Sequence, residues 1–491
     1  MTSFRKSLAI NFASSSGATL VMFFVSVIVA RILTPAEIGI YSIAIVLVNI
    51  AHVFREFGVG SYLQRAESLT SDKVRSAMGI AYAIAFTIAA LLFFGSDVVA
   101  SWFGHPEIAQ VMQILALSFL FIPFSSVALA LLIREYDAAK LSISTAVGTV
   151  AYSVTCIGLA LADFGAASLA WANLANVIST GIANLWLAPK HMAYRPRFSE
   201  SADILRFGAG ALFTNLVKAG NNALPDLILG KLGTPRQVGL LSRANSTVNI
   251  FMQVAGSAIT FGSQTYLSKA FHAKQSLRPI LQRAIALVTA VGWPMLAVTA
   301  IAAEDVIVGL YGDQWIFAAP AILPLALMAA IDLTFHYKVP AFNAIGRPYL
   351  SSIPLLVTAT ARIGLGVLLF TGDIVSFSWA LMLATLATSP IWLALQKKYL
   401  DTDVVPFVRM LLPSALVAGV SAGAAFATLE LVRAAGVDLP LLRIALIAGP
   451  TGLAWLAMLR LLSHPLFDEI MLFAGKLGLW RGSNRTQAEA G

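Results

Sequence analysis

Two short stretches decide the fold of this chain: TPAEIGIYS at Thr34–Ser42 and TPRQVGLLS at Thr234–Ser242. They share the pattern TPxxxGxxS and begin 200 residues apart, and an asparagine follows seven residues after the last serine of each, at Asn49 and Asn249. A motif repeated with its surroundings predicts two copies of one ancestral unit, which is common in membrane transporters.

Further matches extend the repeat along the chain. FGVGSYLQRA from Phe57 is echoed by FGSQTYLSKA from Phe261, and DVVASWFG from Asp97 by DVIVGLYG from Asp305. Arg134 and Tyr136 correspond in the same way to the pair Arg347 and Tyr349. The offset grows from 200 to 213 residues, as expected if short loop insertions separate the copies.

The composition is that of a membrane protein. Hydrophobic residues make up 58% of the chain, charged residues 12%, and mean hydropathy is +0.81, whereas soluble domains are about a quarter charged. Crossing a bilayer takes an apolar run of about 20 residues. We identify about fourteen such runs, at 12–33, 38–60, 76–99, 108–133, 141–162, 166–188, 206–230, 238–266, 280–303, 317–340, 350–371, 375–396, 408–430 and 441–461.

The predicted fold class is therefore an all-α integral membrane protein with about 14 transmembrane helices. Six runs separate the two motifs, so both copies enter the membrane in the same direction and form a parallel repeat. The last two runs have no partner in the repeat. The expected divisions are a first lobe at 1–188, a basic cytoplasmic linker at 189–205, a second lobe at 206–400, two additional helices at 401–461, and an amphipathic segment with a tail at 462–491.

The placement of charge predicts the orientation. The net charge is +9, and if the N-terminus is cytoplasmic, most of the 33 lysine and arginine residues fall on the cytoplasmic side. The positive-inside rule then places both termini in the cytoplasm. This distribution explains the net positive charge, so the charge does not indicate a nucleic-acid partner. The single cysteine, Cys156, allows no disulfide within the chain.

The seventh run carries the richest set of polar residues. Asn215, Lys218, Asn222 and Asp226 follow at spacings of three and four, which places them on one face of a helix. Pro225 is expected to loosen this helix midway. We read the face as part of a transport site, and the alternative is that Lys218 and Asp226 neutralise each other.

Other polar residues in the runs are candidates for the same site. Asn49 and Asn249 place amides at equivalent positions, where hydrogen bonding between helices is the simpler role. Arg362 lies mid-span, where an unpaired arginine costs at least ~2.5 to 3.5 kcal/mol, so we expect it to face water or an anion. Glu56 and His336 are candidate ion carriers, although an inner-rim salt bridge is the simpler role near His336.

Enzyme signatures are nearly absent. The sequence contains no GxxxxGK[ST] phosphate loop, no HExxH and no CxxC. DTD at Asp401–Asp403 matches a metal-dependent glycosyltransferase pattern, but it lies on a short loop with no nucleotide-binding domain around it. We predict no enzymatic activity, no cofactor and no metal.

Three stretches carry a family resemblance: ARILTPAEIGIYSIA from Ala30, REFGVGSYLQR from Arg55, and PDLILGKLGTPRQVGLLSRA from Pro225. Together they resemble the bacterial polysaccharide and O-antigen flippases of the multidrug, oligosaccharidyl-lipid and polysaccharide exporter superfamily. The resemblance implies two six-helix lobes around a central cavity. It also implies a substrate of sugar repeat units on undecaprenyl diphosphate, moved from the inner to the outer leaflet of the bacterial inner membrane by alternating access.

The resemblance also implies basic residues in the first, second, seventh and eighth spans at the cavity. The matching positions are Arg31, Arg55, Lys218 and Arg243, to which we add Arg362 for its burial. Arginine suits a diphosphate through its forked donors. Asp226 stands where such flippases often carry an acid, so it is expected to balance charge or accept a proton.

Three functions remain open at this point. The first is a lipid-linked oligosaccharide flippase, with membrane lipids and other polysaccharide-assembly proteins, such as a polymerase or a chain-length regulator, as partners. The second is a drug or small-cation antiporter of the same fold, in which acidic cavity residues should dominate. The third is a membrane polysaccharide polymerase or ligase, which should carry a large outer loop.

Overall fold

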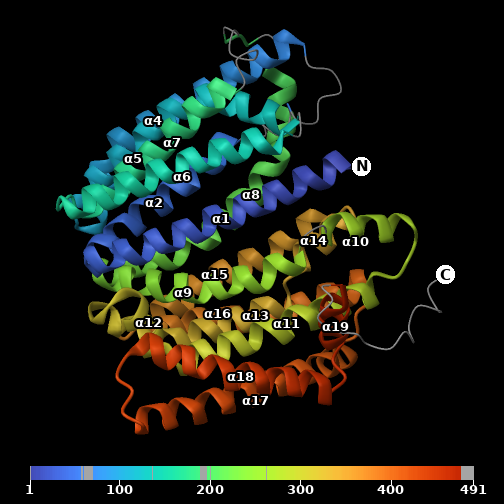
Figure 1. The fold of residues 1–491 in the computed structure, drawn as a ribbon. Coiled ribbons are helices and arrows are strands. Elements are labelled where there is room, and N and C mark those ends of the chain that lie inside the picture. Colours follow the sequence, from blue (N-terminus) through green and yellow to red (C-terminus); the bar gives the residue numbers. More distant parts are fainter. Residues whose placement is uncertain are drawn as a thin grey trace. The chain divides into compact units, whose positions relative to one another are not determined.

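The computed structural model of the chain describes residues 2–56, 59, 63, 70–134, 137–187, 196–198, 201–260 and 263–476. Every regular element in these residues is helical (Figure 1). The elements are α1 (Thr2–Ile32), α2 (Pro35–Glu56), α4 (Ser71–Phe103), α5 (Glu107–Arg134), α6 (Ala138–Leu161), α7 (Ala166–Leu187), α8 (Ser201–Leu232), α9 (Pro235–Thr260), α10 (Ser263–His272), α11 (Leu277–Ile301), α12 (Ala303–Tyr311), η2 (Asp313–Ala321), α13 (Ile322–Thr334), α14 (Lys338–Ala344), η3 (Pro348–Ser351), α15 (Ser352–Leu369), α16 (Ile374–Leu400), α17 (Val404–Ala434), α18 (Pro440–Leu461) and α19 (Pro465–Lys476).

The prediction of an all-α membrane protein is confirmed, whereas the count of fourteen spans stays a prediction. Most predicted apolar runs fall on one helix each. The eighth extends from α9 into α10, the ninth from α11 to the start of α12, the tenth covers η2, α13 and α14 in succession, and the eleventh begins in η3 before α15. Within the described ranges nine helices are long and apolar enough to cross a bilayer, and a bent α5 makes a tenth. Large apolar side chains also face outward, such as Leu91, Phe94 and Trp186, which are 69%, 79% and 76% exposed. An apolar exterior of this kind is stable against lipid and not against water.

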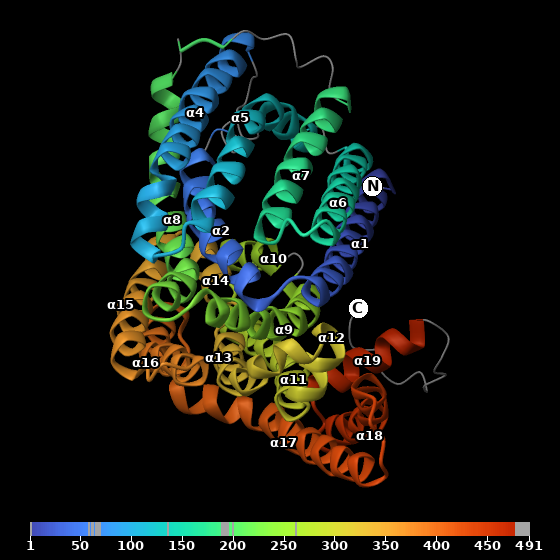
Figure 2. The same cartoon turned by 90° about the vertical axis from the view of Figure 1, so that its left-hand side faces the viewer.

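The chain forms two compact units. The first holds Met1–Arg243, Tyr311–Phe317 and Arg362–Phe377, and the second holds Ala244–Leu310, Ala318–Ala361 and Ser378–Gly491. The division therefore cuts through α9, α12, η2, α15 and α16. In the first unit α7 packs on α5 and α6, and α1 packs on α6 (Figure 2).

The additional C-terminal helices belong to the second unit. There α17 packs on α11, and α18 packs on α17. One buried cluster joins Ala302 and Val306 to Ala425, Leu429 and Ile447. Helices α12, α17 and α18 therefore share one apolar core.

An ion-pair network also ties α17 and α18 to α12. The carboxylate of Asp305 is 3% exposed and lies 3.0 Å from Arg443 Nη1 and 3.4 Å from Arg433 Nη2. Beyond α18, the short helix α19 is joined to α11 by Arg283 and Glu469 at 2.7 Å. The last two predicted spans are thus fixed to the second unit by both apolar and ionic contacts.

Part of the predicted linker and tail lies outside the described residues, namely 189–195, 199–200 and 477–491. The described piece of the linker, 196–198, lies against α4. The Arg197 backbone N–H donates to the Arg75 carbonyl oxygen at 3.0 Å, and its guanidinium lies 3.6 Å from Asp72.

Candidate functional site

The two TPxxxGxxS motifs begin helices α2 and α9 in the same way. Thr34 and Glu37 form a capping box: the Thr34 N–H donates to Glu37 Oε2 at 2.8 Å, and the Glu37 N–H donates to Thr34 Oγ1 at 3.3 Å. Thr234 and Gln237 repeat it at 3.0 and 3.3 Å. The proline of each motif takes the first helical position, where its missing N–H costs nothing.

The motif glycines bring these helix starts together. A Cβ on Gly39 would lie 1.7 Å from the Pro235 carbonyl oxygen, and a Cβ on Gly239 would lie 1.8 Å from the Pro35 carbonyl oxygen. Ser42 Oγ donates to Ser242 Oγ at 3.2 Å. We call this contact of 34–42 with 234–242 the motif junction. It lies wholly in the first unit, and only glycine permits the reciprocal approach.

A further hydrogen bond fixes one side of the motif junction. Gln237 Nε2 donates to the Gly372 carbonyl oxygen at 2.7 Å. Asp373 begins α16 by accepting hydrogen bonds from the backbone of Ser376 and Val375 and from Thr371 Oγ1. These bonds, led by the one from the Ser376 N–H, lower the pKa of the Asp373 carboxyl below its ordinary value. The loop before α16 is therefore held rigidly beside α9.

Arg243 follows directly after the second motif and is 8% exposed. Its Nη1 donates to Ser26 Oγ of α1. Its guanidinium lies over the rings of Tyr311 and Trp315, 5.6 and 5.7 Å from their centroids. These contacts are made to neutral groups, which hold the cation in place without cancelling its charge.

The aromatic segment under Arg243 also closes over the end of α1. Trp315 Nε1 donates to the Ala30 carbonyl oxygen at 2.7 Å, and Gln314 Nε2 donates to the same oxygen at 2.9 Å. The last four carbonyl groups of a helix have no partner within it. η2 thus provides the C-terminal cap of α1 and fixes the ring of Trp315 below Arg243.

Arg362 is 7% exposed and donates from Nη1 to Asn221, at 2.9 Å to the backbone oxygen and 3.3 Å to Oδ1. In a helix the Asn221 carbonyl would accept from the N–H of residue 225, but Pro225 has none. The guanidinium therefore occupies the acceptor that the proline leaves open. This explains how α8 continues through Pro225, where the sequence predicted a loosened helix. It also shows what stabilises a charge at mid-span.

The predicted polar face of α8 is accessible. Asn215, Lys218 and Asn222 are exposed and Asp226 is partly buried. Among the described residues no side chain forms an ion pair with Lys218 or Asp226, or a hydrogen bond to their charged groups. The two do not neutralise each other, because eight residues of helix separate them by about 12 Å.

The remaining predicted residues are divided between the units. Arg31 is exposed in the last turn of α1, Arg55 is half-buried in the last turn of α2, and Asn49 is exposed one and a half turns before Arg55. All three belong to the first unit, as do Lys218, Asn222, Asp226, Arg243 and Arg362. Asn249, also exposed, and His336, which is partly buried beside the ring of Tyr337, belong to the second unit. The side chain of Glu56 lies outside the described residues.

The five cations occupy different levels along the helices of the first unit. Arg243 contacts Ser26, five residues before Arg31, so these two lie toward the C-terminal end of α1. Arg362 contacts α8 beside Asn222 and Lys218, near the middle of that helix. Arg55 lies at the far end of α2, about 30 Å along the helix from the motif junction. The arrangement is a series of positive positions along one unit and not a single cluster.

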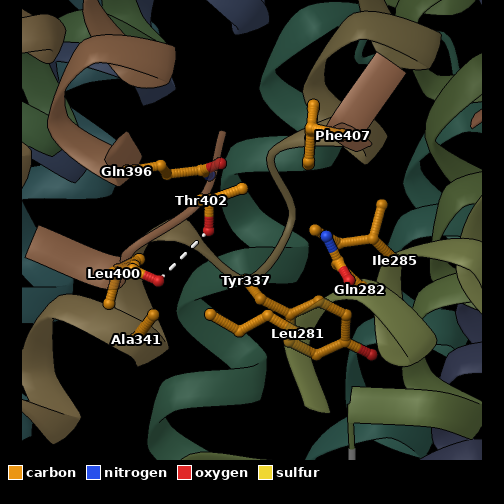
Figure 3. Close-up of a pocket in the computed structure, with 9 residues that line it drawn as sticks. All are labelled: Leu281, Gln282, Ile285, Tyr337, Ala341, Gln396, Leu400, Thr402 and Phe407. Carbon is orange, nitrogen blue, oxygen red and sulfur yellow. Dashed lines mark hydrogen bonds between the residues drawn. The ribbon is translucent and has the colours of Figure 1, made fainter. Parts of the chain in front are cut away.

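A small hollow in the second unit is separate from these residues. It is lined by Leu281, Gln282, Ile285, Tyr337, Ala341, Gln396, Leu400, Thr402 and Phe407 (Figure 3). Gln282, Gln396, Thr402 and Tyr337 bring polar groups to a wall that is apolar elsewhere. Thr402 Oγ1 donates to the Leu400 carbonyl oxygen at 3.3 Å. None of the predicted site residues lines this hollow.

Reasoning from sequence missed the groups that hold the arginines. Tyr311, Trp315 and Ser26 are distant from Arg243 in the chain, and no local pattern joins them. The partner of Arg362 did leave a signal, because Asn221 stands four residues before Pro225 and so carries the carbonyl that a helical proline leaves unpaired.

Comparison with known proteins assigns the family. Residues 28–320 match the family model described as polysaccharide biosynthesis protein. The chain belongs to this family. It is 25% identical to the succinoglycan biosynthesis transport protein ExoT of Rhizobium meliloti over 355 residues, covering 71% of each chain. It is 20% identical to the lipopolysaccharide biosynthesis protein WzxC of Escherichia coli, covering 64% of this chain and 67% of the other.

Solved structures show the same fold at low identity. The lipid II flippase MurJ in an inward closed conformation has a TM-score of 0.73 and 14% identity, covering 96% of this chain and 99% of the other. An inward-facing multidrug resistance transporter of the MATE family, in the MOP superfamily, has a TM-score of 0.61 and 14% identity, covering 78% and 94%. The fold of this family member is thus that of a multi-pass membrane transporter, and these proteins are named as transporters and a flippase rather than as enzymes.

Proposed function

We propose that this polysaccharide biosynthesis family member moves lipid-linked oligosaccharide repeat units, carried on undecaprenyl diphosphate, from the inner to the outer leaflet. The membrane would be the bacterial inner membrane, with both termini cytoplasmic as the charge distribution predicts. The product would serve polysaccharide export, for O-antigen, capsule or exopolysaccharide. Two relatives, named for succinoglycan transport and for lipopolysaccharide biosynthesis, support this class of substrate.

One observation carries the proposal: all five predicted basic residues belong to the first unit, and they lie at different levels along its helices. A diphosphate crossing the membrane needs positive charge at each level, because an unscreened anion in hydrocarbon is costly. Arg55 would meet it near the cytoplasmic side, Lys218 and Arg362 midway, and Arg243 and Arg31 near the outer side. Asn49, Asn222 and Asn249 would offer amides to the sugars.

The motif junction supports alternating access. In the predicted orientation Thr34 and Thr234 lie at the outer face, so the contact of Gly39 with Gly239 would close the outer end between two lobes at 1–188 and 206–400. Release of the substrate outward would require the two helix starts to part. We infer that the structure represents the state in which this end is shut.

The membrane potential can drive the export step. Moving about two negative charges outward across about 100 mV yields roughly 4 to 5 kcal/mol. A coupled ion would add to this. Asp226 is the strongest candidate carrier, since its carboxylate has no ion-pair or hydrogen-bond partner in the part of the chain that the structure describes; Glu56 and His336 are the others.

One observation supports the alternative function of a drug or small-cation antiporter, namely the same carboxylate of Asp226. A cation substrate would however meet five basic residues in the same unit. A polymerase or ligase has no comparable support, because the helices that bound the predicted outer loops follow one another closely, as from Ile32 to Pro35 and from Leu232 to Pro235.

The test is flipping of an undecaprenyl-diphosphate oligosaccharide by the purified chain in proteoliposomes. We expect Lys218→Gln to reduce the rate at least about tenfold. Lys218 is exposed, and its ammonium pairs with no side chain of the described ranges, so its replacement should not unfold the protein. Lys218→Arg should restore much of it. Lys269→Gln is the control, because Lys269 is an exposed lysine of the second unit. Equal rates in Lys218→Gln and wild type would refute the proposed site.

A further inference from the structure

Two cations of the second unit meet at one aromatic ring. The guanidinium of Arg347 lies 5.0 Å from the centroid of the Tyr399 ring, and Lys398 Nζ lies 5.5 Å from it. Arg347 directly precedes η3, and Lys398 and Tyr399 are in the last turns of α16. Both cations are exposed and the ring is partly buried. The two positive charges thus share the Tyr399 ring as a neighbour at the surface.

Neither charge is balanced by a carboxylate of the part of the chain that the structure describes. In the described ranges no carboxylate lies within ion-pairing distance of Arg347 or Lys398. The nearby Asp403 pairs with Arg278 instead, at 3.9 Å, and Asp401 is exposed. Two like charges beside one ring, with no carboxylate to balance them in the described ranges, favour the binding of an anion.

Two other cations of the chain, by contrast, do bind an acceptor of the protein. Lys338 also lies over an aromatic ring, 4.7 Å from the centroid of Trp392, but it is paired with Asp332 at 3.0 Å. Arg134, which corresponds to Arg347 in the repeat, donates from Nη1 to the Leu63 carbonyl oxygen at 2.9 Å. In both cases the protein itself supplies the acceptor.

The helices that lead to this pair expose apolar side chains to lipid. On α15 Ile353 and Leu356 are 51% and 45% exposed, and on α16 Leu386 is 49% exposed. Thr358 Oγ1 donates to Thr388 Oγ1 at 3.2 Å, which pins the two helices together, and both views show them side by side (Figures 1 and 2). From Leu383 to Lys398 the exposed face of α16 rises about 22 Å, roughly the length of an acyl chain.

We propose that Arg347 and Lys398, joined by Tyr399, bind the phosphate of an anionic glycerophospholipid, with an acyl chain along α15 and α16. By the positive-inside rule this end of both helices faces the cytoplasm, where anionic lipids attract basic residues at the membrane surface. Charge complementarity at one end and lipid-facing helices along the remainder select a membrane lipid over a soluble anion. The inference does not depend on which molecule the protein transports.

The experiment is a lipid titration of the full-length chain in detergent, read as the thermal shift on adding phosphatidylglycerol or phosphatidylcholine. Phosphatidylglycerol should raise Tm in a saturable way and phosphatidylcholine should not. In Arg347→Gln/Lys398→Gln the half-saturating phosphatidylglycerol concentration should rise about tenfold or more. The Tm without added lipid should stay near the wild-type value, because both side chains are exposed.

Matched variants separate the site from charge in general. Lys269→Gln/Arg460→Gln removes two other exposed cations of the second unit and should leave the titration unchanged. Tyr399→Phe keeps the ring and should bind like wild type, whereas Tyr399→Leu should weaken binding. Equal titrations for wild type and Arg347→Gln/Lys398→Gln would overturn the proposal. A shift caused by undecaprenyl diphosphate but not by phosphatidylglycerol would overturn it as well, because it would assign the site to the transported lipid.

Discussion

The two copies of the repeat are alike where they touch and different where they carry charge. At the motif junction Gly39 and Gly239 approach each other reciprocally, and both helix starts use the same capping box. One residue after the motif, the first copy has Ile43, which is fully buried, and the second has Arg243. The backbone contact thus keeps the symmetry of the repeat, and the buried charge of Arg243 breaks it.

The same contrast recurs in the second pair of matching stretches. Asp97 of the first copy is exposed, while its counterpart Asp305 is 3% exposed and bound by Arg433 and Arg443. Those arginines belong to α17 and α18, which have no counterpart in the repeat. The equivalent position is therefore a surface carboxylate in one copy and an anchor for α17 and α18 in the other.

The largest effect should come from the motif junction. Gly39→Ala would place a Cβ 1.7 Å from the Pro235 carbonyl oxygen, which belongs to helical backbone and cannot turn away. Overpacking usually costs about 1 to 3 kcal/mol, and here whole helix starts must separate, so we expect the upper end. The measurement is thermal unfolding together with flipping in proteoliposomes.

Gly239→Ala should behave like Gly39→Ala if the contact is symmetric. Gly95→Ala is the control, because Gly95 lies in α4 of the same unit with nothing within 4 Å of its added Cβ. Unchanged stability and activity in Gly39→Ala would show that the two helix starts are not in contact in the working protein.

The second effect concerns the two aspartates. Asp305→Asn leaves Arg433 and Arg443 without their shared carboxylate. Breaking a buried pair costs about 3 to 5 kcal/mol, but both arginines are partly exposed, so we expect roughly 1 to 3 kcal/mol. Asp97→Asn should change the free energy of unfolding by less than about 0.5 kcal/mol. If both substitutions cost the same, Asp305 does not anchor the added helices.

The comparison also shows how much of the structure could be predicted from the sequence. The repeat, the apolar runs and the family resemblance predicted the fold, because hydrophobic periodicity and motif spacing are local properties. The acceptors of Arg243 and Arg362 could not be predicted in the same way. Ser26 and Asn221 lie 217 and 141 residues from the arginines that they bind, and only tertiary packing decides such pairs.

The third effect tests Arg362, the arginine in the middle of a predicted span. Arg362→Met should destabilise the protein, since it removes the donor to the Asn221 carbonyl. In a Pro225→Ala background the N–H of residue 225 can supply that donor, so the loss should be smaller. We expect a coupling of about 1 kcal/mol in the double-mutant cycle, measured by unfolding. Strict additivity would show that Arg362 does not replace the hydrogen bond that Pro225 removes.

The smallest effect separates the two capping boxes. Glu37 and Gln237 both accept from a threonine N–H, but only an amide can also donate, and Gln237 Nε2 donates to the Gly372 carbonyl oxygen. Glu37→Gln keeps a capping box and should be nearly neutral. Gln237→Glu keeps the acceptor but sets a carboxylate against a carbonyl oxygen, which should cost about 1 kcal/mol. Equal unfolding midpoints for the two variants would mean that the bond to Gly372 adds nothing, and that the two motifs are equivalent in their capping as well as in their contact.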